Sequence, residues 1–213
     1  MDFLPEHISS YSEIHTTEES DVLKKLNRAT HIEVLQPRML SGHLQGRLLK
    51  MIVQMIRPSK ILEIGTYTGY SAICMAEGLD KNGIIHTIDI NEELESITNR
   101  FIKQAGFENQ IKQYIGDAVE IIPTINEQFD LVFMDADKEN YLTYYDLLID
   151  KLNSGSYILA DNVLWSGKVT EEAKPNDKET KHLQEFNQRI QEDDRVENIL
   201  LPVRDGLFLI RVK

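Results

Sequence analysis

The chain has 213 residues, a length more typical of one α/β domain than of two, and its 41% hydrophobic residues are enough to build a core. Its 35 acidic and 23 basic residues give a net charge of −12, and no stretch concentrates Lys and Arg, which disfavours a nucleic-acid partner. Apolar runs are only strand-sized, and residues 1–6 lack the basic flank and apolar core of a signal peptide, so we expect a soluble, cytoplasmic protein without a membrane partner. Cys74 is the single cysteine, which excludes an internal disulfide and a cysteine zinc site.

Two helices are predicted in the amino-terminal part of the chain. Thr16 and Glu19 have the spacing of a capping box, and the apolar residues that follow recur at helical intervals, which predicts a helix over residues 17–30. Ser41 is predicted to cap a second amphipathic helix, which Pro58 ends. We expect these helices, within residues 1–57, to cover a cofactor and substrate site.

From Lys60 the sequence alternates between short apolar runs and amphipathic stretches, which predicts strands joined by helices. Strands that are apolar on both faces indicate a parallel sheet covered on both sides, with all strand carboxyl ends at one edge. We therefore expect one domain, 1–213, with a core at 58–213. The predicted strands are 61–64, 84–88, 111–115, 131–134 and 157–160, and the predicted helices 71–79, 92–105, 117–122, 140–152 and 178–191.

The last two predicted strands, 196–201 and 207–212, are not joined by a helix as the earlier ones are. Only the turn-rich segment 202–206 separates them, which is too short for a parallel crossover. They should form an antiparallel pair at the end of the sheet.

A glycine-rich turn, Glu63–Ser71, follows the first predicted strand. Such a turn lets a ligand approach the backbone at Gly65, although close packing of strand on helix explains it equally well. It is not a dinucleotide fingerprint: with Gly65 as the second glycine, Glu63 and Thr68 occupy the other two glycine positions. Glu63 suits a ligand that carries positive charge, such as the amino and sulfonium groups of S-adenosylmethionine.

Acidic residues follow the next two strands. Asp89 lies 24 positions beyond Gly65 and can accept hydrogen bonds from both ribose hydroxyls, or it can cap a helix, for which Asn91 is the better candidate. Asp117 can bind an adenine amino group, with the Ala118 N–H on a ring nitrogen, or it can be a helix N-cap.

Oxygen-bearing side chains also follow the fourth and fifth strands. Asp135, Asp161 and Asn162 should lie within a few ångströms of one another and present oxygen ligands only, which suits Mg²⁺, or Ca²⁺ or Mn²⁺. Asp and Asn are also common turn residues. However, neighbouring carboxylates repel unless a cation or a lysine lies among them. Lys138 lies where a helix begins, and there its charge opposes the helix dipole, so a purely stabilising role explains it poorly.

Taken together, these segments resemble the cation-dependent O-methyltransferases, which include catechol O-methyltransferase and plant caffeoyl-CoA O-methyltransferase, and most of all their small bacterial members. The resemblance runs from Tyr11 to Lys213. It is carried by Gln45-Gly46-Arg47, Glu63–Ser71, Asp135-Ala136-Asp137-Lys138-x-Asn140-Tyr141, Asp161–Gly167 and Asp205-Gly206-Leu207. It implies a Rossmann-like class I methyltransferase fold: a seven-stranded, mostly parallel sheet with helices on both faces and an antiparallel strand near the carboxyl terminus.

The resemblance also implies a role for each site residue. Lys138 would be the general base, Asp135, Asp161 and Asn162 would bind the divalent cation, and Asp89 would hold the ribose of S-adenosylmethionine. Asp117 and Ala118 would hold its adenine, and Asp135 would also contact the cofactor. The methionine part would be held by Met39, Ser41, Glu63, Gly65, Tyr67 and Ser71.

The resemblance implies an aromatic small-molecule substrate with vicinal hydroxyls, such as a catechol or a caffeoyl group. Trp165 would wall the ring, or be an ordinary core or loop aromatic. The lack of clustered Lys and Arg disfavours a coenzyme A ester. Two alternatives stay open: a methyltransferase acting on a hydroxylated wobble uridine of tRNA, and a non-catalytic cofactor-binding module. Relatives are usually dimers, so we expect a homodimer, with an interface at the antiparallel end of the sheet and residues 17–30.

Overall fold

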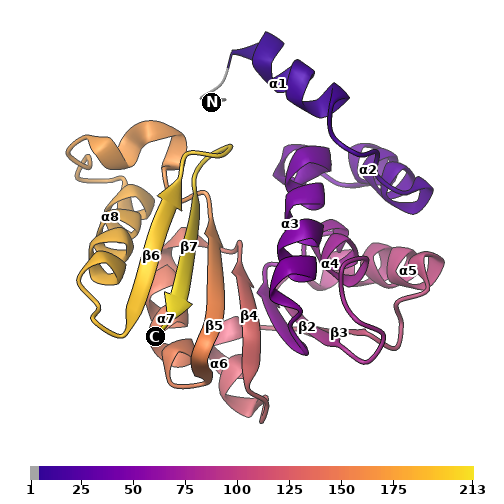
Figure 1. Ribbon diagram of the computed structural model, residues 1–213. Coiled ribbons are helices and arrows are strands. Elements are labelled where there is room, and N and C mark those ends of the chain that lie inside the picture. The colour runs from indigo at the N-terminus through magenta and orange to yellow at the C-terminus, as the bar shows by residue number, and fades with distance from the viewer. Residues whose placement is uncertain (1–4) are drawn as a thin grey trace.

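The computed structural model describes residues 5–213, so residues 1–4, which contributed to the signal-peptide expectation, lie outside it. Strands and helices alternate through most of this part (Figure 1). The strands are β1 (Lys60–Ile64), β2 (Ile84–Asp89), β3 (Ile111–Ile115), β4 (Phe129–Met134), β5 (Leu152–Asp161), β6 (Val196–Leu201) and β7 (Leu207–Val212). The α-helices are α1 (Glu6–Ile14), α2 (Asp21–Glu33), α3 (Gly42–Ile56), α4 (Tyr70–Ala76), α5 (Glu95–Ala105), α6 (Ala118–Thr124), α7 (Tyr141–Ile149) and α8 (Lys178–Gln191).

The strands form one sheet in the order β3-β2-β1-β4-β5-β7-β6. Pairs from β3 to β5 are parallel, while β7 runs antiparallel to both of its neighbours, β5 and β6. The predicted antiparallel pair is therefore confirmed, and its second strand lies inside the sheet rather than at its edge. This is the predicted Rossmann-like methyltransferase architecture.

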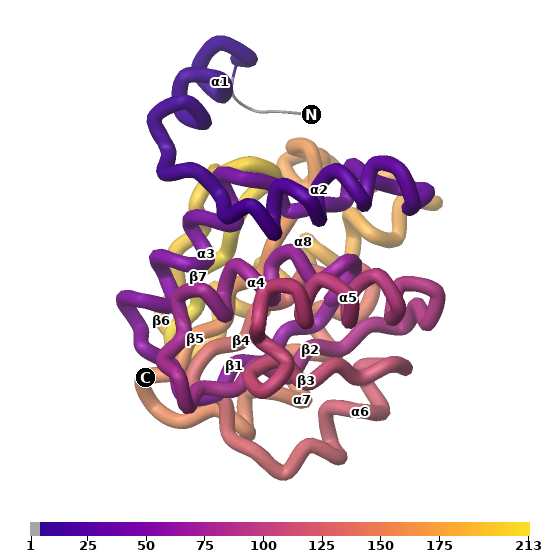
Figure 2. The backbone as a smooth tube through the Cα atoms, turned by 90° about the vertical axis from the view of Figure 1, so that its right-hand side faces the viewer, coloured from indigo at the N-terminus to yellow at the C-terminus, as the bar shows by residue number. Residues whose placement is uncertain are grey.

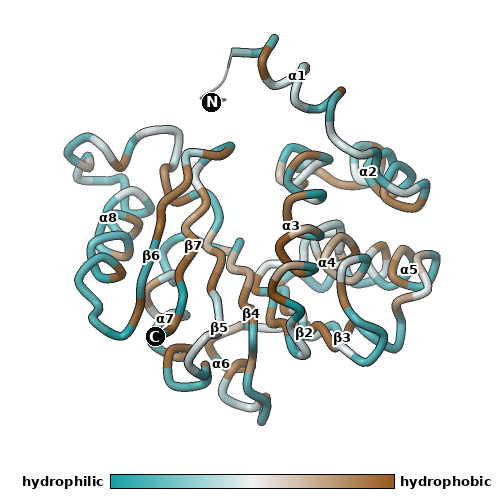
Figure 3. The backbone as a smooth tube through the Cα atoms, viewed as in Figure 1, coloured by the Kyte–Doolittle hydropathy of each residue, from teal (hydrophilic) through white to brown (hydrophobic). Residues whose placement is uncertain are grey.

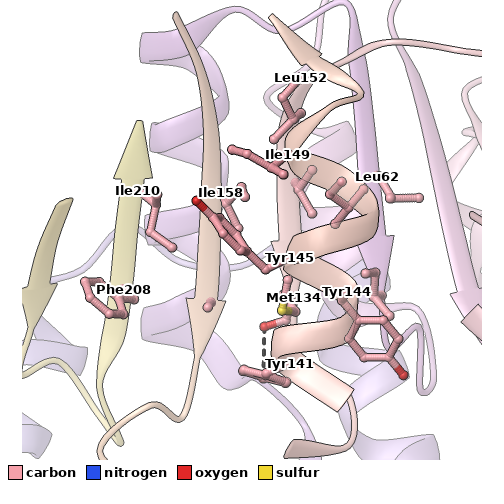
Figure 4. Packing of buried hydrophobic residues seen from close by; sticks show 14 of the residues in the cluster. Leu62, Met134, Tyr141, Tyr144, Tyr145, Ile149, Leu152, Ile158, Phe208 and Ile210 are labelled. Carbon is pink, nitrogen blue, oxygen red and sulfur yellow. Dashed lines mark hydrogen bonds between the residues drawn. The ribbon is translucent and has the colours of Figure 1, made fainter. Parts of the chain in front are cut away.

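Each face of the sheet has its own hydrophobic core. Helices α6, α7 and α8 cover one face, and α2, α3, α4 and α5 cover the other (Figures 1 and 2). On α7, Tyr141, Tyr145 and Ile149 pack toward β4 and β5 (Figure 4). Hydrophobic residues gather on the central strands and on α3 (Figure 3). Apolar faces on both sides of the strands explain why a parallel sheet forms here.

Several local predictions at the amino terminus were wrong. The Thr16–Glu19 capping box does not form; the Thr16 hydroxyl instead donates to the Ser12 carbonyl, and α2 begins only at Asp21. Ser41 precedes α3 as predicted, but its side chain makes no capping hydrogen bond. A short polar signal specifies a helix end only when the neighbouring packing permits it.

The sequence analysis also missed α1. None of its residues is buried, and it stands away from the body of the molecule (Figures 1 and 2). Its apolar side chains Ile8, Tyr11 and Ile14 are exposed. In the described part of the chain, no helix is both long and apolar enough to cross a membrane.

The strand register brings the site together. Ile64 at the end of β1 pairs with Met134 at the end of β4, and the Asp135 N–H donates to the Ile64 carbonyl at 2.8 Å. The Gly65 N–H donates to the Ile88 carbonyl of β2 at 2.9 Å. The segments that follow β1, β2 and β4 therefore start side by side at one edge of the sheet.

Candidate active site

A cavity of about 1180 Å³ opens at the carboxyl ends of β1 to β5. Its wall combines the segments that follow these strands with residues 33–41, which precede α3. All predicted site residues except Glu63 line it, namely Met39, Ser41, Gly65, Tyr67, Ser71, Asp89, Asp117, Ala118, Asp135, Lys138, Asp161, Asn162 and Trp165. Residues from widely separated parts of the sequence thus share one surface.

Gly65 makes the floor of the cavity possible. Its φ is 101°, and a Cβ atom here would lie 2.0 Å from the Asp135 carbonyl oxygen, so no other residue fits without moving the backbone. Two residues later Tyr67 has a φ of 50°, and its N–H donates to Asp89 at 2.6 Å. The turn is thereby closed against β2 and leaves room for a ligand above Gly65.

Glu63 is placed differently from the expectation that it faces a charged ligand. It is fully buried behind the cavity wall, where the Thr87 hydroxyl donates to Oε2. Burial raises the pKa of the Glu63 carboxyl to about 8, an effect that the Ser71 and Thr87 hydroxyls oppose. At neutral pH this side chain is therefore mostly protonated, and in this arrangement it presents no charge to the cavity.

The two acidic residues expected at adenosine line the cavity and also have local structural roles. Asp89 accepts from the Asn91 N–H at 2.8 Å, while Asn91 itself caps the next helical turn by accepting from Glu93. Asp117 is the N-cap of α6 and accepts from the Val119 N–H at 2.8 Å. Both alternatives drawn from the sequence for Asp117 are thus compatible, because a capping carboxylate keeps free lone pairs.

Lys138 lies between the ends of β4 and β5 and is only 5% exposed. Its Nζ donates to Asp135 Oδ1 at 3.2 Å, to the Tyr141 hydroxyl at 2.6 Å and to the Asp161 carbonyl at 3.5 Å. Three acceptors match the three N–H groups of an ammonium. The lysine is thus a positive charge of the kind expected among these carboxylates.

Asp161 is a buried carboxyl beside a second carboxyl, Asp135. Burial and the charge of Asp135 raise its pKa to about 6, while Gln45, Lys138 and Arg204 oppose the shift. Its Oδ2 accepts from Gln45 Nε2 at 2.6 Å, and its Oδ1 accepts from the Asn162 N–H at 2.9 Å. The carboxylate is therefore fixed in one orientation.

The donor set suits a hard divalent cation. Within residues 5–213, no three His, Cys, Asp or Glu side chains converge on one point. The candidate ligands are therefore two carboxylates, Asp135 and Asp161, with the amide of Asn162, and all of them line the cavity. Oxygen ligands of this number leave positions for water or substrate oxygens, as Mg²⁺ sites do.

Both carboxylate oxygens of Asp137 accept hydrogen bonds from neighbouring side chains. Its Oδ1 accepts from the Tyr144 hydroxyl and its Oδ2 from Asn140 Nδ2, both at 2.6 Å. Lys138 has a different neighbour in Tyr141, which also contacts the Met134 carbonyl (Figure 4). Burial and nearby carboxylates hold the pKa of Tyr141 well above its usual value, so its hydroxyl stays protonated.

Comparison with known proteins agrees with this geometry. The O-methyltransferase family model matches residues 12–213. The chain belongs to this family. Caffeoyl-CoA O-methyltransferase of Petroselinum crispum is 36% identical over 178 residues, covering 78% of this chain and 74% of the relative. The Stellaria longipes enzyme of the same name is 32% identical, covering 91% and 84%.

Solved structures support the same assignment. A SAH-bound methyltransferase from Podospora anserina superposes with a TM-score of 0.91 at 28% identity, covering 100% of this chain and 99% of that one. An O-methyltransferase from Bacillus cereus, in complex with SAH, gives 0.88 at 27% identity and 97% coverage of both chains. The protein is therefore an O-methyltransferase with the fold predicted from its sequence.

Backbone strain in this O-methyltransferase is concentrated at the cavity. Among the described residues, six other than glycine have a positive φ, and all except Arg57 line it: Tyr67, Asn162, Trp165, Ser166 and Arg204. Left-handed backbone at a residue other than glycine costs on the order of 1–3 kcal/mol, and it persists where the surrounding structure enforces it. Strained backbone of this kind clusters at functional sites, and here it lies on the cavity wall.

Three functional candidates escaped the sequence analysis: Gln45, Tyr141 and Arg204. Gln45 and Tyr141 were noted only as members of motifs, because nothing local indicates that they contact Asp161 and Lys138. Arg204 lies in the turn between β6 and β7, lines the cavity and donates to the Ser41 carbonyl. Its positive φ could not be read from the sequence.

We predict that Glu63→Gln removes a pH dependence of stability. The folded-state pKa of about 8 lies above the ordinary 4.5. Between these pH values the Glu63 carboxyl is protonated in the folded protein and ionised in the unfolded chain. The free energy of unfolding should therefore fall as pH rises through this window, by at most about 1.4 kcal/mol per pH unit. An amide imitates the protonated carboxyl and loses this slope.

Urea unfolding of both proteins between pH 6.5 and 8, above the pKa of Asp161, isolates the contribution of Glu63. Glu92→Gln, at an exposed position, is the control and should follow the parent protein. Parallel curves for parent and Glu63→Gln would show that Glu63 is charged throughout this range.

Proposed function

We propose that this O-methyltransferase transfers the methyl group of S-adenosylmethionine to one hydroxyl of a vicinal diol on an aromatic small molecule, with the help of a divalent cation. The observation that carries the proposal is the grouping of Asp135, Asp161, Asn162 and Lys138 on the cavity that also contains the Gly65 turn. SAH in the Bacillus cereus structure and SAM in that of TomG from Streptomyces achromogenes, which is 27% identical, support the choice of cofactor.

The cavity wall offers matching partners for that cofactor. Asp89 would hold the ribose hydroxyls, and Asp117 with Ala118 the adenine. The methionine part would lie along Met39, Ser41, Gly65, Tyr67 and Ser71, with Glu63 behind them. S-adenosylmethionine supplies a methyl group on a positively charged sulfur, and in-line transfer requires an acceptor oxygen about 3 Å away on the far side.

On the acceptor side, Asp135, Asp161 and Asn162 would hold the cation. When bound, it lowers the pKa of a chelated hydroxyl, as a metal does for water. Lys138 Nζ, once it has released one of its own protons to solvent, would accept the proton of the attacking hydroxyl, while the Tyr141 hydroxyl and the Asp161 carbonyl keep it in place. Trp165 would pack against the ring.

Three observations bear on the acceptor. Three basic side chains, Arg38, Lys138 and Arg204, line the cavity among a larger number of acidic ones, which disfavours a tRNA substrate. The curated relatives named above are caffeoyl-CoA O-methyltransferases. A second hollow of about 480 Å³ is lined by Lys174, Lys178 and Lys181 together with Glu139 and Asp177, so basic side chains outnumber acidic ones there, although the sequence shows no basic run. This grouping favours a coenzyme A ester as the second candidate acceptor.

The first test is turnover of a catechol that carries a carboxylic acid, and of the coenzyme A thioester of the same acid, each with and without chelator. Excess EDTA should abolish methyl transfer, and Mg²⁺ should restore it. Calorimetric binding of SAH should persist in EDTA, because the adenosine partners lie on other strands. Undiminished transfer in excess chelator would overturn the role of the cation.

A second prediction concerns Lys138. If Nζ accepts the substrate proton, Lys138→Met should lower kcat by about 10²–10⁴-fold, with little effect on SAH affinity. Its rate should then recover as pH rises and the substrate ionises unaided. A kcat–pH profile of similar height and shape in both proteins would show that Lys138 is not the base.

We also propose a homodimer, with a changed interface. The apolar residues Leu23 and Leu26 of α2 pack into the chain's own core, so the 17–30 face is not free for a partner. The exposed Ile8, Tyr11 and Ile14 of α1 and the edge strand β6 are the available surfaces. Light scattering at micromolar concentration should give twice 24.6 kDa, and a monomer would contradict the proposal.

A further inference from the structure

Helix α3, which is distant from β5 in the sequence, brings a side chain to the candidate cation site. Gln45, in the first half of α3, lies 116 residues from Asp161 in the sequence, yet its Nε2 donates to Asp161 Oδ2 at 2.6 Å. Both residues are only 3% exposed. At this distance, and out of contact with bulk water, the hydrogen bond is a strong one to a charged acceptor.

The bond has a specific consequence for the carboxylate. With Oδ1 held by the Asn162 N–H and Oδ2 by Gln45, the Asp161 carboxylate cannot rotate about its Cβ–Cγ bond. Lys138 contacts the carbonyl oxygen of Asp161 and not its carboxylate. Gln45 is thus the side chain that determines which lone pairs of Asp161 remain open toward the cavity.

A purely structural role explains Gln45 poorly. Its Oε1 is buried and has no hydrogen-bond partner among the described residues. An unpaired buried amide oxygen destabilises a fold, and an apolar side chain of similar size would fill this position without that cost. The cost of burying Oε1 is therefore accepted together with the hydrogen bond that Nε2 makes to Asp161.

We propose that Gln45 is a positioning residue for the divalent cation, acting by holding the Asp161 carboxylate in its ligating orientation. This inference rests on the proposed function, since it requires that Asp161 binds a cation. Hydrogen-bond partners that orient a ligating side chain contribute strongly to metal affinity, and their loss weakens it by about 10–100-fold. Gln45 itself does not line the cavity.

The test is the affinity for Mn²⁺ alone, measured by electron paramagnetic resonance without methyl donor or acceptor. Gln45→Met keeps the length of the side chain and removes the donor, and it should weaken Mn²⁺ binding about 10–100-fold. Gln54→Met, at an exposed position of the same helix, is the matched control and should bind like the parent. Calorimetric SAH affinity should stay within a few-fold in all three proteins, which shows that the variants are folded.

The outcomes are distinguishable. Equal Mn²⁺ affinity in the parent and in a Gln45→Met protein that binds SAH would overturn the role of Gln45 alone. No Mn²⁺ binding by the parent would overturn the cation in the proposed function, and this inference with it. If Gln45→Met fails to bind SAH, Gln45→Asn is used instead, because its amide is too short to reach Asp161. It should weaken Mn²⁺ binding similarly.

Discussion

Repulsion between the carboxylates of Asp135 and Asp161 is the constraint on which this site depends. They follow neighbouring strands, and burial strengthens their interaction, as the raised pKa of Asp161 indicates. The surrounding structure offsets part of this repulsion with hydrogen bonds: Lys138 donates to Asp135, and Gln45 and the Asn162 N–H donate to Asp161. These partners come from α3, from the β4–α7 connection and from the segment that follows β5, so the charge pair links separate elements to one another.

Much of this site could be predicted because the order of strands along the sequence indicates which residues lie close together in the fold. Once a parallel sheet is inferred, the residues after each strand must meet at one edge, and Asp89, Asp117, Asp135 and Asp161 do so. The prediction needs no knowledge of side-chain contacts. The prediction fails for Glu63, which still belongs to β1. Side chains near the end of a strand lie on alternate faces of the sheet, and that of Glu63 is buried in the protein interior.

Other features could not be predicted, since they depend on tertiary packing. In the sequence, Gln45 is one more polar residue of an amphipathic helix; only the structure shows that it contacts Asp161 at the end of β5. The three lysines of the second hollow are separated by acidic residues in the sequence; Lys178 and Lys181 share the first turn of α8, and the segment before this helix brings Lys174 to them. Helix α1 buries no side chain, so the core-facing periodicity used to find the other helices was not available.

The same site combines several features that oppose stability: like charges, strained backbone at Asn162, Trp165 and Arg204, and an unpaired oxygen on Gln45. A fold selected for stability alone would replace them with apolar side chains and glycine. Their concentration on one cavity therefore indicates a binding surface whose groups are fixed in advance. A positively charged ligand that neutralises the carboxylates would stabilise the native state, because its free energy of binding adds to the free energy of unfolding. The like charges that oppose folding are thus the same groups that the proposed cation would bind.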